Sequence, residues 1–120
     1  LLVGSDSGVL LSPHGIATHT EMQLLNQAGL SNFEVLAAAT INPAKALKLD
    51  DELGQIQPGF KADFIYSHDN PIDGLEVLIA PDAVIKQGEW YSKQQLIELR
   101  KNAIANRSLW QEFKTLVEAL

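Results

Sequence analysis

The sequence predicts an α/β chain that forms one part of a larger fold, and three observations support this prediction. An apolar run at residues 1–4 (LLVG) is typical of a short buried strand; helical periodicity, short β-prone segments and helical periodicity again follow it. This order of elements makes neither a complete barrel nor a doubly wound sheet by itself. The chain also begins with Leu-Leu rather than Met, so we expect it to be a fragment of a longer protein.

The composition limits the class of protein. Of the 120 residues, 46% are apolar and 20% are charged, which is typical of a globular chain that buries a core. Nine basic and 15 acidic residues give a formal net charge of −6, which argues against a nucleic-acid partner. No apolar stretch reaches the roughly 20 residues of a membrane span, so no membrane partner is expected. The absence of cysteine excludes disulfides and thiolate metal sites within this chain.

A first helix is expected after the N-terminal strand and the loop of residues 6–15. Thr18 and Glu21 have the spacing of a capping box, in which a hydroxyl and a carboxylate each accept a free backbone N–H. The helix is therefore expected to begin near Thr18 or Thr20 and to end at Gly29. Its apolar stripe consists of Met22, Leu24, Leu25 and Ala28.

A second helix is expected to begin at Ser31, because Ser31 and Glu34 repeat the capping-box spacing. Pro43 would cost about 3 kcal/mol in the middle of a helix. It is therefore expected in the first turn of a separate short helix.

The pattern then changes from helical to β-prone. Short strands are expected at residues 63–67 and 83–86, and a tight turn is expected at 87–89. Helical periodicity returns at Ser92, and the C-terminal part is expected to form two helices broken near residues 106–108.

Three stretches together resemble one family. Residues 4–8 (GSDSG) are similar to the motif that closes the last barrel strand of metal-dependent amidohydrolases. Residues 28–30 (AGL) and 37–44 (AAATINPA) resemble the helix pair that follows in that family. Residues 53–64 (LGQIQPGFKADF) resemble the segment where the chain leaves the barrel for a small β-sandwich. Pro13-His14-Gly15 favours the branch of the imidazolonepropionase-like enzymes and the Xaa-Pro dipeptidases (prolidases).

The resemblance extends from Gly4 to about Gly88 and implies the organisation of the chain. Residues 1–50 would be the C-terminal end of a (β/α)8 hydrolase barrel, namely strand eight and the helices after it. Residues 51–91 would belong to the small, composite β-sandwich. Residues 92–120 would form C-terminal helices.

The resemblance also implies a chemistry. Such enzymes hold one or two divalent ions, usually zinc, and the ion lowers the pKa of a bound water. Asp6 maps to the aspartate of the eighth strand, which ligates the metal and takes the proton of the attacking water. His14, in the loop behind Asp6, is a candidate substrate contact, and a solvated imidazole is the alternative. Without the motif, Asp6 would be an ordinary turn residue.

The sequence departs from the family pattern in its metal ligands. It contains no His-x-His motif, and its histidines are His14, His19 and His68. One carboxylate cannot replace a shell of four or five ligands, so the other ligands are expected outside this chain. The fragment alone is therefore expected to be inactive.

Structural roles are favoured for the other polar candidates. His19 is expected to cap or pack at a helix start, and His68 to lie in a surface turn. Thr40 and Asn42 are expected to satisfy backbone groups, and Asp63 to be a structural acid where the barrel meets the sandwich. Core or interface positions are expected for the aromatic residues Trp90, Tyr91, Trp110 and Phe113.

The function that the sequence predicts is hydrolysis of C–N bonds, in an amide, a cyclic amide or a proline-containing dipeptide, by the parent protein. Its partner would be a small-molecule or dipeptide substrate, and a homo-oligomer is expected. A cytoplasmic location is favoured, although a missing N-terminus leaves export open. Two alternatives remain: a non-catalytic module that self-associates through exposed apolar faces, and a binding protein on the same fold that has lost its metal.

Overall fold

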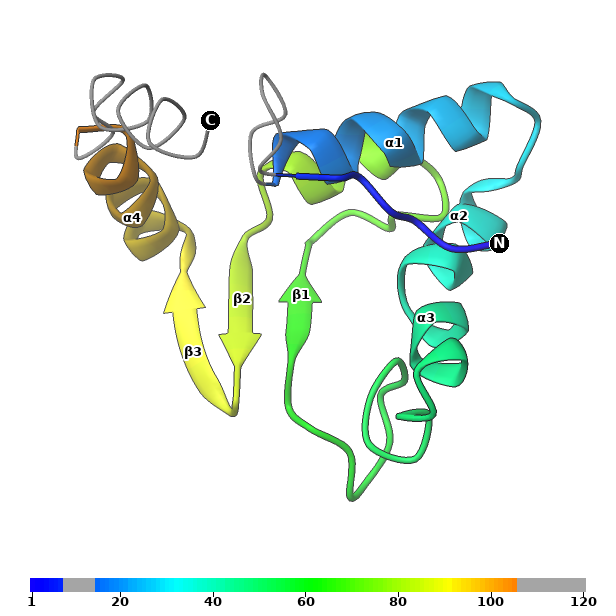
Figure 1. The fold of residues 1–120 in the computed structure, drawn as a ribbon. Coiled ribbons are helices and arrows are strands. Elements are labelled where there is room, and N and C mark those ends of the chain that lie inside the picture. Colours follow the sequence, from blue (N-terminus) through cyan, green and yellow to red (C-terminus); the bar gives the residue numbers. More distant parts are fainter. Residues whose placement is uncertain (8–14, 106–120) are drawn as a thin grey trace, which may run out of the picture.

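A computed structural model of the chain describes residues 1–7 and 15–105. In Figure 1, α2 and α3 lie on the β1 side of a three-stranded sheet, α1 lies above it, and α4 lies on the β3 side. The elements, in chain order, are α1 (Ile16–Gln27), α2 (Asn32–Ala39), α3 (Ile41–Ala46), β1 (Phe64–Tyr66), the 3-10 helix η1 (Leu75–Ile79), β2 (Ala83–Lys86), β3 (Glu89–Ser92) and α4 (Lys93–Ala105).

Helix α1 begins earlier than the sequence predicts. Its first residue is Ile16 and its N-cap is Gly15, with no side-chain cap. The predicted capping box of Thr18 and Glu21 is therefore wrong, because both residues already lie inside the helix. The predicted end is confirmed: the helix stops at Gln27, and Gly29 follows with a φ of 106°.

The second capping box is present. The Ser31 hydroxyl accepts the backbone N–H of Glu34 at 3.3 Å, and the Glu34 carboxylate accepts the backbone N–H of Ser31 at 2.8 Å. These bonds satisfy two backbone donors at the start of α2 and hold the pKa of Glu34 below its usual range, with the Ser31 hydroxyl as the larger cause. Pro43 is the third residue of α3, so its predicted place in a first turn is confirmed.

The sheet is antiparallel and follows the order β1-β2-β3, as the predicted strand positions allow. Ile85 pairs with Phe64 on one side and with Trp90 on the other. Gln87 and Gly88, both with positive φ, form the turn between β2 and β3. Ser92 and Gln95 then exchange side-chain and backbone hydrogen bonds at the start of α4. The predicted helix start at Ser92 is confirmed to within a residue, whereas the expected break near 106–108 lies outside the described residues.

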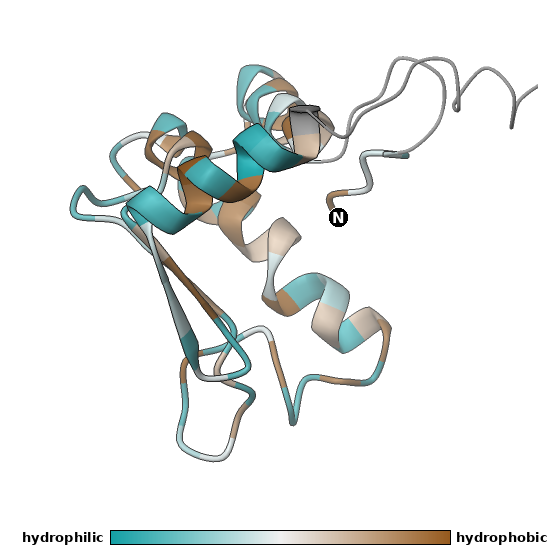
Figure 2. Ribbon diagram, turned by 90° about the vertical axis from the view of Figure 1, so that its left-hand side faces the viewer, coloured by the Kyte–Doolittle hydropathy of each residue, from teal (hydrophilic) through white to brown (hydrophobic). Residues whose placement is uncertain are grey.

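The core joins helices from the N-terminal half to η1. Val35, which is completely buried, packs in one cluster with Met22, Leu75 and Leu78. Many apolar side chains remain outside this core. Helix α4, nearest the viewer in Figure 2, has hydrophobic residues among hydrophilic ones, and its Ile97 and Leu99 are both exposed.

The loop between α3 and β1 is held at two points. Gly54 lies so close to α3 that an added Cβ would come within 2.8 Å of the Cβ of Ala44. Further along, Lys61 donates its backbone N–H to the carbonyl of Glu52 at 2.8 Å, and its ammonium pairs with the Glu52 carboxylate at 2.5 Å. This contact with Glu52 raises the pKa of Lys61. The loop therefore has a defined path into β1.

The predicted buried strand at residues 1–4 is wrong for the described chain. Residues 1–6 form no strand, and Leu1 and Leu2 are exposed, with 69% of the Leu1 surface accessible. A strand is stable only when a neighbour completes its ladder of backbone hydrogen bonds. Here the N–H of Val3 instead donates to the carbonyl of Ala38 at the end of α2, at 3.0 Å. Among residues 1–7 and 15–105, no strand pairs with residues 1–6, which run along helices instead.

Candidate functional site

The segment that precedes Asp6 is fixed to three helices. The side-chain amide of Asn42, on α3, donates to the Leu1 carbonyl at 3.2 Å. The N–H of Val3 donates to Ala38 on α2 at 3.0 Å. The N–H of Gly4 donates to Oε1 of Glu21, on α1, at 2.8 Å. The backbone leading to Asp6 is therefore positioned by α1, α2 and α3 together. Figure 1 shows this N-terminal segment running below α1.

A short chain of hydroxyl groups flanks Asp6. The Ser5 hydroxyl lies 2.7 Å from that of Ser7 and 3.2 Å from that of Thr18. All three residues are half-buried. The Ser5 and Ser7 hydroxyls therefore contact each other on either side of the aspartate, and Ser5 also contacts α1.

Asp6 itself is exposed and has a φ of 47°, in the left-handed region that aspartate tolerates better than most residues. Within residues 1–7 and 15–105, its carboxylate joins no hydrogen bond or ion pair. A carboxylate without such a partner keeps its oxygens available for a cation, a proton or solvent. This arrangement differs from that of a turn aspartate whose side chain caps its own backbone.

The histidines do not converge on Asp6. His14 lies outside the described residues, so its candidate role toward substrate stays a prediction. His19 is half-buried on α1, and its backbone N–H donates to Gly15 as part of the helix. His68 is exposed and its backbone N–H donates to Asp82, which confirms its position in a surface turn.

The described residues do not form a complete metal site. They contain no group of three or more histidine, cysteine, aspartate or glutamate side chains arranged around one point. Asp6 fits the role of a single oxygen ligand, because its carboxylate is exposed and not otherwise bound. A tetrahedral zinc site needs three or four protein ligands, so the described residues do not form one by themselves.

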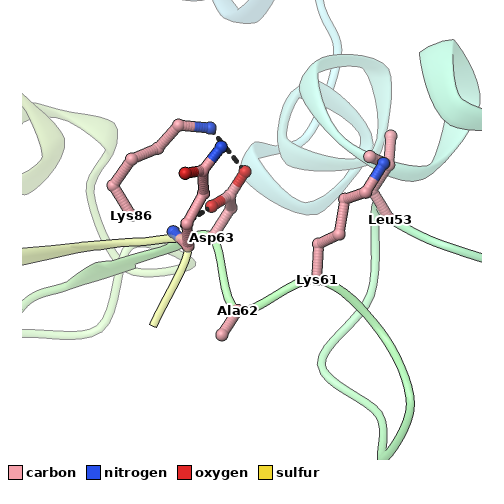
Figure 3. Close-up of a pocket in the computed structure, with 6 residues that line it drawn as sticks. Leu53, Lys61, Ala62, Asp63 and Lys86 are labelled. Atoms are coloured by element: carbon pink, nitrogen blue, oxygen red, sulfur yellow. Dashed lines mark hydrogen bonds and ion pairs between the residues drawn. The ribbon is translucent and has the colours of Figure 1, made fainter. Parts of the chain in front are cut away.

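A second polar cluster lies on the sheet and not at Asp6. The hollow in Figure 3 is lined by Leu53, Lys61, Ala62, Asp63, Lys86 and Gln87, and none of these belongs to the N-terminal segment. Asp63 accepts the Lys86 ammonium and the Gln87 backbone N–H, both at 2.6 Å. These two contacts, the lysine first, hold the pKa of Asp63 below its usual range. Asp63 thus joins the β2–β3 turn to the residue before β1, which agrees with its predicted structural role.

The remaining polar candidates also have structural contacts. The Thr40 hydroxyl donates to the Leu36 carbonyl at 2.7 Å, and Asn42 binds Leu1, so both satisfy backbone groups as predicted. Sequence reasoning missed Asp82, whose carboxylate accepts the His68 N–H and the Lys93 ammonium, both at 2.9 Å. The His68 N–H first, and then Lys93, lower the pKa of Asp82. No local motif marks Asp82, since its partners lie 14 and 11 residues away.

The aromatic residues on the sheet are surface-lying. The rings of Tyr66 on β1 and Trp90 on β3 have centroids 5.8 Å apart, and both residues are exposed. They pack on each other across the sheet and not in the core. Trp110 and Phe113 lie outside the described residues.

The comparison with protein families decides the class of the chain. A model of the amidohydrolase family matches residues 1–91. The chain belongs to the amidohydrolase family. The matched span includes Asp6 and ends on β3, so the expected end of the resemblance near residue 88 is confirmed and α4 lies beyond it.

Similar proteins are hydrolases of several kinds. The chain is 31% identical over 100 residues to 5-methylthioadenosine/S-adenosylhomocysteine deaminase of Teredinibacter turnerae, a match that covers 71% of the chain. It resembles a Xaa-Pro dipeptidase solved with bound methionine in its active site (34% identity, 74% of the chain, TM-score 0.64). It also resembles a candidate prolidase from Bifidobacterium longum (38% identity, 75% of the chain, TM-score 0.69).

These three proteins are much longer than this chain. The match covers 22% of the deaminase, 21% of the dipeptidase and 22% of the Bifidobacterium protein, so the chain spans about a fifth of each.

Within residues 1–7 and 15–105, no helix combines the length and the apolar character that crossing a bilayer requires.

Proposed function

We propose that the protein to which this chain belongs hydrolyses C–N bonds by a metal-activated water, and that Asp6 takes part in the reaction. The observation that supports this most directly is an exposed carboxylate that has no hydrogen-bond or ion-pair partner among the described residues, inside the segment that the amidohydrolase family matches. The similar deaminase and Xaa-Pro dipeptidase both bear names that denote cleavage of a carbon–nitrogen bond. The proposed substrate is an amide, a cyclic amide or a Xaa-Pro dipeptide.

Asp6 has two tasks in this proposal. One carboxylate oxygen would bind a divalent ion, for which zinc is proposed, and the other would accept a proton from the attacking water. A bound zinc ion supplies a water of lowered pKa and polarises the scissile carbonyl. Asp6 then returns the proton to the leaving nitrogen, so that the amine departs neutral.

The other parts of the proposal concern the parent protein. Residues 1–50 belong to the end of the barrel, 51–91 to the small β-sandwich and 92–120 to C-terminal helices. The other metal ligands come from outside this chain, and the protein is proposed to be a cytoplasmic homo-oligomer.

The full-length protein with Asp6→Asn tests the role of Asp6. The amide keeps the shape of the side chain but removes the proton acceptor, so turnover is expected to fall at least about 100-fold with the fold retained. Asp69→Asn is the matched control, because Asp69 is also exposed and lies in a surface turn. Steady-state kinetics, circular dichroism and metal content are measured for both variants. Wild-type turnover of Asp6→Asn would refute the role.

A second candidate is a non-catalytic module that self-associates. It is favoured by the exposed apolar side chains, among which Leu1, Phe33, Leu47 and Ile56 are prominent. Sedimentation of the 120-residue chain tests it, and a monomer at all concentrations contradicts it. Metal analysis of the full-length protein separates a hydrolase from a binding protein that has lost its metal, since only the hydrolase retains a stoichiometric ion.

A further inference from the structure

Two residues on one face of α1 contact the backbone that leads to Asp6. Thr18 and Glu21 are three residues apart, and this spacing places them on the same side of a helix. Glu21 accepts the N–H of Gly4 at 2.8 Å, and the Thr18 hydroxyl lies 3.2 Å from that of Ser5. The pair resembles a capping box in sequence, but its partners are residues 4 and 5 and not the start of the helix.

We propose that Glu21 is a positioning residue for Asp6: it fixes the backbone two residues upstream so that the free carboxylate meets the ligands from the rest of the protein. This inference rests on the proposed function of Asp6. Thr18 supports the same segment through Ser5.

The hydrogen bond between Glu21 and Gly4 matters because the Asp6 side chain is not itself held in place. The Asp6 carboxylate has no partner within the described residues, so no side-chain contact sets its direction. Its direction follows from the path of residues 4 and 5. The contacts of Leu1 and Val3 fix the segment further upstream, whereas Glu21 and Thr18 act at the two residues immediately before the aspartate.

Glu21 is suited to this role by charge and position. A hydrogen bond from a backbone N–H to an ionised carboxylate is roughly twice as strong as one to a neutral acceptor. Glu21 is half-buried, and its carboxylate reaches the exposed backbone of Gly4 across 17 positions of the sequence. It also lies in the middle of α1, a continuous helix of 12 residues, so its own position is well determined.

A direct role as a metal ligand would be a different proposal, and the choice of variants separates the two. Glu21→Gln keeps an oxygen that accepts the Gly4 N–H but gives a poor metal ligand. Glu21→Ala removes the acceptor altogether. A positioning role therefore predicts rescue by glutamine, and a ligand role predicts none.

Glu34→Ala is the matched control. Glu34 also accepts a backbone N–H at 2.8 Å, that of Ser31, but it does so at the start of α2. Both alanine variants lose one carboxylate-to-backbone bond, and Glu34→Ala also loses the bond from the Ser31 hydroxyl at 2.6 Å, but only the loss at Glu21 affects residues 4–6. A general loss of stability would affect the two variants alike.

The experiment uses the full-length protein, with three measurements. In Glu21→Ala, kcat is expected to fall about 10–100-fold, with KM nearly unchanged, as for other residues that support a metal ligand. Zinc affinity, measured by titration of the metal alone, is expected to fall over the same range. In the metal-free protein, hydrogen exchange of the peptide covering residues 1–7 is expected to accelerate about 10-fold at Gly4. Glu21→Gln restores most of each quantity, and Glu34→Ala leaves exchange at Gly4 and zinc affinity unchanged.

The results overturn the proposal if Glu21→Ala retains wild-type kcat and zinc affinity, or if Glu21→Gln is as impaired as Glu21→Ala. Equal effects of Glu34→Ala and Glu21→Ala on zinc affinity would also overturn it, since the cause would be general destabilisation. The proposed function fails separately, through an active Asp6→Asn variant. In that case, exchange at Gly4 still reports whether Glu21 fixes the segment.

Discussion

Gly54→Ala is expected to be strongly destabilising for two separable reasons. Gly54 has a φ of 88°, where a Cβ costs roughly 1–2 kcal/mol. That Cβ would also lie 2.8 Å from the Cβ of Ala44, 3.1 Å from the Cα of Ile41 and 3.1 Å from the carbonyl oxygen of Thr40. Two of these neighbours are backbone atoms, which cannot rotate away, so overpacking adds roughly 1–3 kcal/mol. The expected loss in the free energy of unfolding is about 2–5 kcal/mol.

Gly59→Ala provides the control, because Gly59 has a φ of 91° and an added Cβ there meets nothing within 4 Å. This variant is expected to lose only the conformational part, roughly 1–2 kcal/mol. The difference between the two variants therefore measures the close approach of residue 54 to α3.

Urea unfolding of the 120-residue chain, followed by circular dichroism, provides the measurement. With a slope of about 1–3 kcal/mol per molar urea, the midpoint of Gly54→Ala should lie about 1 M below that of Gly59→Ala. Equal midpoints and slopes would refute the reasoning, since the left-handed backbone would then account for the whole effect and the contact with α3 for none.

Two further predictions concern charge and metal. The folded-state pKa values of Asp63 and Asp82 are lowered, so their contribution to stability is present at neutral pH and is lost as the pH falls below about 4. Between about pH 6 and about pH 3, the midpoint of urea unfolding should fall less steeply with decreasing pH in Asp63→Asn than in the unchanged chain. An equally steep fall in both would contradict this assignment. The isolated 120-residue chain is expected to show no hydrolysis with added zinc, because Asp6 would supply only one ligand of the proposed shell of about four; metal-dependent turnover by the chain would contradict this.

Sequence reasoning succeeded where the determining interactions are local. The capping box of Ser31 and Glu34 and the first-turn position of Pro43 depend on neighbours within one turn of a helix. The strands β1 and β2 were also predictable, because alternation and turn residues mark them within a few positions.

Sequence reasoning failed where residues far apart in the sequence determine the hydrogen bonds. Thr18 and Glu21 have the spacing of a capping box, yet Glu21 binds Gly4, which lies 17 residues away. The apolar run at residues 1–4 has the composition of a buried strand, but a strand also needs a neighbouring strand, and the described part of the chain places none beside residues 1–6. The candidate role of Asp6 came from the resemblance to the family motif, whereas the contacts that hold the backbone before it became visible only in the structure.

The junction between β3 and α4 has a practical consequence for engineering. The strand ends at Ser92 and the helix starts at Lys93, with no spacer between them. Lys93 is bound to Asp82 at 2.9 Å, so the first turn of the helix is also tied to the start of β2. This boundary nearly coincides with the end of the family match at residue 91, so it looks like a suitable place to truncate the chain or to insert a reporter domain. A change between residues 92 and 93 would, however, separate the strand from the helix and disturb the pair of Lys93 with Asp82.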